Sequence, residues 1–336
     1  MKIIIFGAGQ AGYTAARRLK QNMPEAEVLI FDHDACGLYA KMRLPDYVAG
    51  KVAREKLILA SGDAMRSQGI EPHLGENIER IDPAGKEIFT SAGEAYSYDI
   101  LILASGAKAF VPPVKGVENV DVFTLRTMED ADRIIDRSRI VKEALVIGGG
   151  LLGLEAAWAL RERGLDVTVV EFMDRLLPRQ LDETESAILL EKLGGTGLHF
   201  RLGISAVNVE KGMAPDSVKV TFSDGSSMDT GLLLFSAGIR SQIHPAADCG
   251  LKVNKAIIVD HRFRTSLSDI YAIGDCAEID GRTWGLWIAA KDQGEALGDI
   301  LSGKRDSFES PVYTPSLKIS GVQLKDICRE AAEKKQ

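Results

Sequence analysis

One local pattern occurs twice in this chain. A short run of β-branched and apolar residues is followed by the spacing G-x-G-x-x-G and then by a segment of helical composition, at residues 2–20 and again at 144–163. In both copies a second apolar run follows and ends in an acidic residue, Asp32 or Glu171. Parallel strands joined by helices predict the α/β class, with two doubly wound, Rossmann-like sheets that helices cover on both faces.

The glycines of the first copy, Gly7, Gly9 and Gly12, each have a predicted task. The first forms a tight turn, the second lets the backbone approach a pyrophosphate, and the third lets the helix pack closely on the strand. The N–H groups at the start of the helix bind the anion, and Asp32 accepts a hydrogen bond from a ribose hydroxyl. The alternative is an ordinary tight turn. We call this loop the first cradle.

The second copy, which we call the second cradle, repeats the spacing at Gly148, Gly150 and Gly153. Two cradles predict two bound dinucleotides. An acid such as Glu171 accepts from a free 2′-hydroxyl and repels a 2′-phosphate, so the sequence favours NADH over NADPH. The alternative is that Glu171 only caps a loop.

Composition excludes several other classes of protein. Of the 336 residues 45% are hydrophobic and 26% are charged, as in globular proteins, and a net charge of −7 disfavours nucleic-acid binding. The apolar runs are far shorter than the roughly 18 residues of a membrane span. Met1 leads into a strand rather than a signal peptide, so we expect a cytoplasmic protein. The cysteines are scattered without a Cys-x-x-Cys spacing, which predicts neither a disulfide scaffold nor a metal site.

Breaks in the pattern predict the domain boundaries. Pro112-Pro113 is a stiff connection that few helices or central strands could continue, and a second boundary is expected near Gly238, where new strands begin. The first domain is therefore predicted to be discontinuous, with the second inserted into it. The predicted ranges are 1–112 and 238–303 for the first domain, 113–237 for the second, and 304–336 for a C-terminal segment too short for a core of its own.

Three further segments carry a family resemblance. Residues 103–107 and 235–238 are similar to a repeated A-T-G segment, and residues 271–275 match a G-D motif. Together with the cradles they resemble the two-dinucleotide-binding-domain flavoproteins of the pyridine nucleotide-disulfide oxidoreductase superfamily, above all the NADH:rubredoxin reductases and the flavin part of assimilatory nitrite reductases. The resemblance implies FAD in the first cradle and NAD(P)H in the inserted domain.

The resemblance also implies roles for residues outside the cradles. Asp275 would bond the ribityl chain of FAD, and the helix near Trp287 would point its N-terminus at the flavin pyrimidine, where it stabilises the negative charge of the reduced ring. Residues 39–45 would lie beside the flavin, where Lys41 pairs with an FAD phosphate or with Glu155. In relatives this glutamate lies near the nicotinamide. The alternative for Glu155 is a solvated helix charge.

These expectations define the predicted site, which contains no metal ligand. The residues expected to act in catalysis are Lys41 and Glu155. Those expected to bind FAD are Gly7, Gly9, Gln10, Ala11, Gly12, Asp32, Lys41, Arg43, Ile78, Ala104, Ser105, Gly106, Gly274, Asp275, Trp287, Ile288 and Ala289. Those expected to bind NAD are Gly148, Gly150, Leu151, Leu152, Gly153, Glu171 and Gly238.

No redox thiol is expected beside the flavin. The resemblance puts Met42 where relatives carry a reactive cysteine, and a thioether forms neither a thiolate nor a sulfenate. We interpret Cys36, which lies six residues upstream, as structural, and the alternative is a redox thiol. We therefore hypothesise an FAD-dependent NADH oxidoreductase that passes electrons from the flavin to a small redox protein, rubredoxin by resemblance. The alternatives are the flavoprotein subunit of a nitrite reductase-type or NADH oxidase-type enzyme, and a flavin-based redox sensor.

The C-terminal part departs from the family pattern. Relatives continue past a segment similar to residues 317–322 into a third, interface domain, whereas here one short charged helix follows, with Ile327 and Cys328 predicted on one side. We therefore expect either an exposed flavin, open to a partner or a small oxidant, or a homodimer or second subunit that completes the site.

Overall fold

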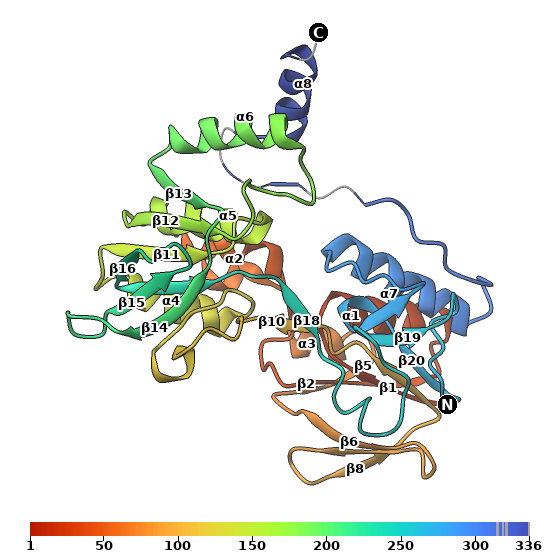
Figure 1. Ribbon diagram of the computed structural model, residues 1–336. Coiled ribbons are helices and arrows are strands. Elements are labelled where there is room, and N and C mark those ends of the chain that lie inside the picture. Colours follow the sequence, from red (N-terminus) through yellow and green to blue (C-terminus); the bar gives the residue numbers. More distant parts are fainter. Residues whose placement is uncertain (314–315, 318, 320–321, 335–336) are drawn as a thin grey trace. The chain divides into compact units, whose positions relative to one another are not determined.

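The structure, a computed structural model, describes residues 1–313, 316–317, 319 and 322–334. Within this part the chain forms two compact units, both drawn in Figure 1. The first unit comprises Met1–Ala40, Glu55–Lys108 and Ile239–Thr314, and the second comprises Lys41–Arg54, Ala109–Gly238 and Pro315–Gln336.

The first unit is built on a five-stranded parallel sheet. Its strands lie in the order β20 (Ile270–Ala272), β9 (Ile100–Leu103), β1 (Lys2–Phe6), β2 (Glu27–Asp32) and β5 (Ile70–Leu74). Apolar residues predominate in the central strands, and the isoleucines of β1 have no exposed surface, because an all-parallel sheet is covered on both faces. The strand order reverses beside β1, and ligands of doubly wound sheets bind at such a point.

Helices α1 (Gln10–Asn22) and α7 (Trp287–Leu301) pack along each other in the first unit (Figure 1). A Cβ added to Gly294 would lie 2.5 Å from the carbonyl oxygen of Ala11, and one added to Gly298 would lie 2.6 Å from the Cβ of Arg18. These contacts advance in the same direction along both helices, so the helices are parallel. Their N-termini therefore lie at the same end of the pair.

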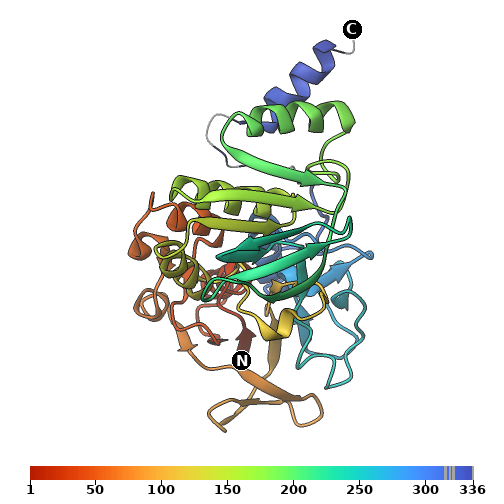
Figure 2. The ribbon, with the colours of Figure 1, turned by 60° about the vertical axis from the view of Figure 1, so that its left-hand side comes forward.

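The second unit repeats this architecture on a smaller scale. Its parallel sheet has the order β13 (Leu198–Leu202), β12 (Asp166–Glu171), β11 (Glu143–Ile147) and β17 (Leu232–Phe235), and Figure 2 shows these strands side by side. Here too the strand order reverses beside the first strand of the unit, β11. The helices of this unit are α2 (Leu44–Val48), α4 (Met128–Ser138), α5 (Leu151–Glu162), α6 (Glu183–Gly194) and α8 (Leu324–Lys334).

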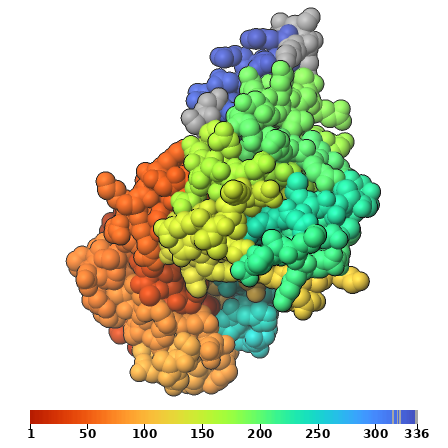
Figure 3. Space-filling view, turned by 90° about the vertical axis from the view of Figure 1, so that its left-hand side faces the viewer, coloured from red at the N-terminus to blue at the C-terminus, as the bar shows by residue number. Residues whose placement is uncertain are grey.

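Shorter elements complete both units. The antiparallel strands β6 (Ile78–Asp82), β7 (Glu87–Thr90) and β8 (Ala95–Ser97) form part of the outer surface of the first unit, orange in Figure 3. The others, with η for 3-10 helices, are β3 (Leu38–Tyr39), η1 (Lys41–Arg43), η2 (Arg54–Leu57), β4 (Ile58–Ala60), α3 (Gly62–Arg66), β10 (Ala107–Ala109), η3 (Val117–Asn119), β14 (Ala206–Lys211), β15 (Val218–Phe222), β16 (Ser227–Thr230), β18 (Ile239–Ser241), β19 (Ile257–Val259), η4 (Gly274–Cys276) and β21 (Ala277–Ile279).

The predicted α/β class with two Rossmann-like sheets is confirmed. Both predicted strand–helix–strand units form, and β20 rejoins the first sheet beside β9, so the second unit is inserted into a discontinuous first unit. No helix in the described ranges is both long enough and apolar enough to cross a membrane.

Residues 41–54 group differently from the predicted division, because they belong to the second unit. Helix α2 of this segment packs against α4 and α5. The Tyr47 hydroxyl donates to Asp132 on α4 at 2.6 Å, and Arg163 at the end of α5 donates to the carbonyl oxygen of Val48 at 2.8 Å. These bonds join segments that are 85 and 115 residues apart in the chain, which local sequence patterns do not reveal.

The C-terminal helix α8 packs against α6, with an ion pair of 2.9 Å between Lys192 and Glu330. Ile327 is fully buried in this contact, and Cys328, although exposed, lies close to Glu185 on α6. Within the segment 317–322, positions 318, 320 and 321 lie outside the described residues.

Candidate functional site

The first cradle shows a geometric reason for each of its glycines. Gly7 has φ +113°, and a Cβ on it would lie 2.2 Å from the carbonyl oxygen of Ala104. A Cβ on Gly12 would lie 1.9 Å from the carbonyl oxygen of Gly7, so only glycine lets α1 approach the turn. By contrast, a Cβ on Gly9 would meet no atom within 4 Å. The backbone at Gly9 is therefore open to a ligand.

Asp32 holds this loop from the end of β2. Its carboxylate accepts from the N–H of Ala8 at 2.6 Å and from the N–H of Asp34 at 2.8 Å, and it lies 3.1 Å from Nδ1 of His33. Burial alone would raise the pKa of Asp32, but the hydrogen bonds from His33 and from the backbone of Asp34 outweigh it and lower this pKa below its usual value. The group is a carboxylate at neutral pH and can accept from a hydroxyl.

The second cradle repeats this geometry. Gly148 has φ +124° and a Cβ on it would lie 2.3 Å from the carbonyl oxygen of Ser236, while a Cβ on Gly153 would lie 2.0 Å from the carbonyl oxygen of Gly148. Gly150 is again open, with no atom within 4 Å of an added Cβ. Glu171 takes the place of Asp32 and accepts from the N–H of Gly149 at 2.6 Å.

Both cradles are suited to bind a pyrophosphate. Helices α1 and α5 begin at Gly9 and Gly150, which offer no side-chain cap, and neither helix has an acidic residue in its first turn. The first N–H groups of a helix have no partner within the helix, and the helix dipole favours an anion there. The A-S-G and S-A-G segments after β9 and β17 line the two turns, because Ala104 and Ser236 contact the first glycines.

The remaining predicted FAD residues of the first unit are found in three places. The Ser105 hydroxyl donates to the carbonyl oxygen of Gln242 at 2.8 Å, which ties this segment to the returning strand. Gly274 and Asp275 form the turn η4 after β20. Trp287 begins α7, followed by Ile288, which is exposed, and Ala289, which is buried, while the side chain of Ile78 is buried in β6.

Other predicted residues lie in the second unit. Lys41 lines a cavity of about 30 Å³ together with Leu152 of the second cradle and Ser236. Arg43 pairs with Asp46 at 3.3 Å. Glu155 on α5 is only 5% exposed, which excludes the reading as a solvated helix charge. The structure therefore places Lys41 on the unit that carries the second cradle, together with Glu155.

Leu151 and Gly238 complete the predicted NAD residues. Leu151 is the first residue of α5, next to Gly150. Gly238 follows β17 with φ +99°, a backbone conformation that favours glycine.

Three of the four cysteines show no environment that activates a thiol. Burial raises the pKa values of Cys249, Cys276 and Cys328, which disfavours thiolates. In the described ranges no group of three or more His, Cys, Asp or Glu side chains is placed to hold a metal ion.

Two residues that contact the turn η4 are absent from the predicted site residues, although Gln293 lies on the helix that the resemblance places at the flavin. Gln293 on α7 and Ser241 on β18 both bond to the turn η4, at 2.7 Å to the N–H of Gly274 and 2.6 Å to the carbonyl oxygen of Asp275. Gln293 could have been found in the sequence only as a polar residue on a helix face that otherwise carries small and apolar residues. Ser241 has no such local signal.

Comparisons with known proteins agree with this geometry. Residues 1–294 match the family described as pyridine nucleotide-disulphide oxidoreductase. The chain is 32% identical over 325 residues to the assimilatory nitrate reductase electron transfer subunit of Bacillus subtilis (strain 168), covering 96% of this chain and 42% of that protein. It is 35% identical over 332 residues to the nitrite reductase [NAD(P)H] large subunit of Klebsiella oxytoca, covering 96% and 34%.

A solved structure gives the same result. NADH:rubredoxin oxidoreductase from Clostridium acetobutylicum superposes with a TM-score of 0.82 at 27% identity, covering 96% of this chain and 80% of that one. The chain spans well under half the length of the two curated relatives above. With two matching cradles and a family match over residues 1–294, this chain belongs to the pyridine nucleotide-disulphide oxidoreductase family.

Proposed function

We propose that this chain is an FAD-dependent NADH oxidoreductase that passes electrons to a small redox protein such as rubredoxin. The chain binds FAD and NADH. The observation that carries the proposal is the doubled cradle, in which two helices with uncapped N-termini each follow a glycine turn that an acidic side chain holds. One such loop suits one dinucleotide, and two suit an electron donor and its acceptor.

We assign FAD to the first cradle and NADH to the second by the family resemblance. In this proposal Gly9 and Asp32 hold the pyrophosphate and a ribose of FAD, and the Gly274–Asp275 turn holds its ribityl chain. Gly150 and Glu171 hold NADH. Glu171 is fixed by the N–H groups of Gly149 at 2.6 Å and of Met173 at 2.9 Å, so its carboxylate stays where it repels a 2′-phosphate.

FAD, when bound, accepts two electrons from NADH and can release them one at a time. The protein contributes orientation and charge rather than a general base. The buried carboxylate of Glu155 and the ammonium group of Lys41 both lie in the second unit, where we place the nicotinamide. Met42 lines the same cavity as Lys41 and offers no thiol to relay electrons, so the acceptor must come from outside this chain.

A small electron carrier is the acceptor that best fits this arrangement. Two similar proteins support it, the electron transfer subunit of Bacillus subtilis and the NADH:rubredoxin oxidoreductase of Clostridium acetobutylicum. A second candidate is the flavoprotein part of a nitrite reductase-type enzyme, which the 35% identity to the Klebsiella oxytoca protein favours. That reaction needs iron–sulfur and haem ligands, which the four scattered cysteines of these 336 residues do not supply, so a further domain or another subunit would carry them.

The test is anaerobic stopped-flow absorbance of the FAD-loaded chain. NADH should bleach the visible flavin band, NADPH should bleach it more slowly, and oxidised rubredoxin should then restore it. Gly150→Ala is the matched control, because it should retain FAD but need a higher NADH concentration for the same bleaching. A flavin that NADH leaves oxidised would refute the dehydrogenase, and rapid bleaching without reoxidation by rubredoxin would refute this acceptor. Slow turnover with a lasting NADH–flavin charge-transfer band would instead indicate a redox sensor.

A further inference from the structure

The turn η4 is held by a side chain to which neither the sequence pattern nor the family comparison assigns a role. Resting on the proposed binding of FAD in the first unit, we propose that Gln293 is a positioning residue. By holding the Gly274–Asp275 turn against helix α7, it sets the reduction potential of the bound flavin.

Gln293 is almost completely buried, with 1% of its surface exposed. Its side-chain oxygen accepts from the N–H of Gly274 at 2.7 Å, across 19 residues of sequence. A buried amide that reaches a backbone N–H is expensive to leave unpaired, so this bond is kept in the folded state. This hydrogen bond fixes the position of the turn η4 along the axis of α7.

The turn also packs closely against α1 and is bonded to β18. Gly274 has φ +76°, and a Cβ on it would lie 2.9 Å from the Cβ of Ala11 on α1. Beside it, a Cβ on Gly294 would lie 2.5 Å from the carbonyl oxygen of Ala11. The Ser241 hydroxyl donates to the carbonyl oxygen of Asp275 at 2.6 Å from the other side. Gln293 thus bonds the turn to α7, while α1 packs against the same turn.

The position of the turn matters for the chemistry because the positive end of α7 and the carboxylate of Asp275 both lie in this region. Helix α7 begins after Leu286 without a side-chain cap and without an acidic residue in its first turn, so its positive end is available to a reduced flavin. The turn itself carries the Asp275 carboxylate. If the turn loosens, water enters and the field of the helix N-terminus is weakened, so the reduced flavin is stabilised less than the oxidised one.

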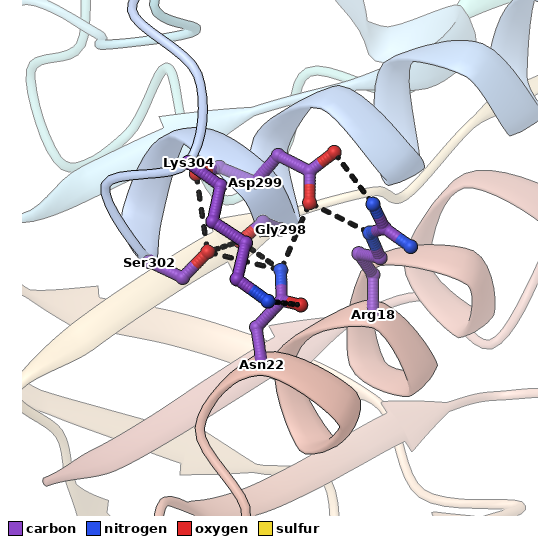
Figure 4. A network of polar contacts seen from close by, with 6 residues as sticks. All are labelled: Arg18, Asn22, Gly298, Asp299, Ser302 and Lys304. Carbon is purple, nitrogen blue, oxygen red and sulfur yellow. Dashed lines mark hydrogen bonds and ion pairs between the residues drawn. The ribbon is translucent and has the colours of Figure 1, made fainter.

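A purely structural role predicts something different, and the other end of the same helix pair offers a control. Figure 4 shows Asp299 of α7 accepting from Arg18 at 2.6 and 2.9 Å and from Asn22 at 2.9 Å. Asp299 follows Gln293 by six residues, about 9 Å along the helix axis. Asp299→Asn therefore weakens the packing of α1 on α7 without touching the turn.

The experiment compares Gln293→Met, which has a similar volume and no acceptor for the Gly274 N–H, with Asp299→Asn and the wild type, all loaded with FAD. The midpoint potential of the flavin is measured by dye equilibration, and thermal unfolding is measured on the same samples. We expect Gln293→Met to bind reduced FAD threefold to tenfold less tightly relative to oxidised FAD. A tenfold change corresponds to a potential about 30 mV more negative. Asp299→Asn should lower the unfolding temperature and leave the potential unchanged.

The proposal is overturned if Gln293→Met keeps the wild-type potential, or if Asp299→Asn shifts it equally for the same loss of stability. Should Gln293→Met not yield folded protein with FAD, Ser241→Ala is measured instead, since it releases the turn from the opposite side. An unshifted potential in Ser241→Ala then overturns the proposal, and a negative shift supports it. A wild-type protein that does not retain FAD would contradict the proposed function rather than this role of Gln293.

Discussion

The two kinds of glycine in the second cradle give a prediction that separates folding from binding. Gly150 and Gly153 lie three residues apart on the same loop and helix, and each is replaced by alanine. At Gly153 the new Cβ would lie 2.0 Å from the carbonyl oxygen of Gly148 and 3.0 Å from its carbon, both backbone atoms that no rotamer change can move. At Gly150 it would meet nothing within 4 Å.

The magnitudes follow from these contacts. Gly153→Ala forces α5 away from the turn, and overpacking of this kind costs about 1–3 kcal/mol or more. Gly150 has φ −78° and ψ 177°, which alanine adopts without strain, so Gly150→Ala loses only the preference for glycine at a helix start, about 1 kcal/mol or less. Its methyl group, however, stands where a pyrophosphate would approach. We expect a loss of at least about tenfold in NADH affinity, or about 1.4 kcal/mol.

The assay uses the FAD-loaded protein. Guanidinium unfolding followed by circular dichroism gives the free energy of unfolding, and titration with NADH gives the dissociation constant. Gly150→Ala should unfold close to the wild type and bind NADH weakly, whereas Gly153→Ala should be clearly destabilised. The reasoning is refuted if Gly150→Ala loses as much stability as Gly153→Ala, or if it binds NADH as tightly as the wild type.

Two further predictions concern charged side chains. Replacing Glu171 by serine should reduce the preference for NADH over NADPH at least about tenfold, because the repulsion of a 2′-phosphate is removed. The ratio of the kcat/KM values for the two coenzymes measures this preference. An unchanged ratio would contradict the role assigned to Glu171. The hydrogen bonds from Arg18 lower the pKa of Asp299 below its usual value, so this pair stabilises the fold above the unfolded-state pKa, near 3.8, and the gain is lost as the pH falls through the lower folded-state pKa. Urea unfolding should therefore show a smaller difference between the wild type and Asp299→Asn at pH 3 than at pH 7, and an equal difference at both would argue against the ion pair.

The elements that the sequence predicted well are those that depend on neighbouring residues. The strand Lys2–Phe6 forms over the predicted residues, and the glycine spacing places Gly7 and Gly148 at positive φ. Strand propensity, glycine conformations and the pairing of an acid with the preceding loop act over about twenty residues or fewer, and such patterns are visible in the chain itself. The repeat of the whole unit then implied two cradles.

Long-range packing decided the rest. The grouping of residues 41–54 with the second unit depends on the bond from Tyr47 to Asp132, and the burial of Ile327 depends on α6. The hydrogen bond between Gln293 and Gly274 joins α7 to the turn η4 across 19 residues, and no local sequence pattern predicts this contact. The sequence by itself determined that two dinucleotide cradles form, because their geometry depends on glycines and strands that are close together in the chain. Only the tertiary structure decided which side chains hold the turn and to which unit Lys41 belongs, because these contacts join residues far apart in the chain and form only when each unit folds.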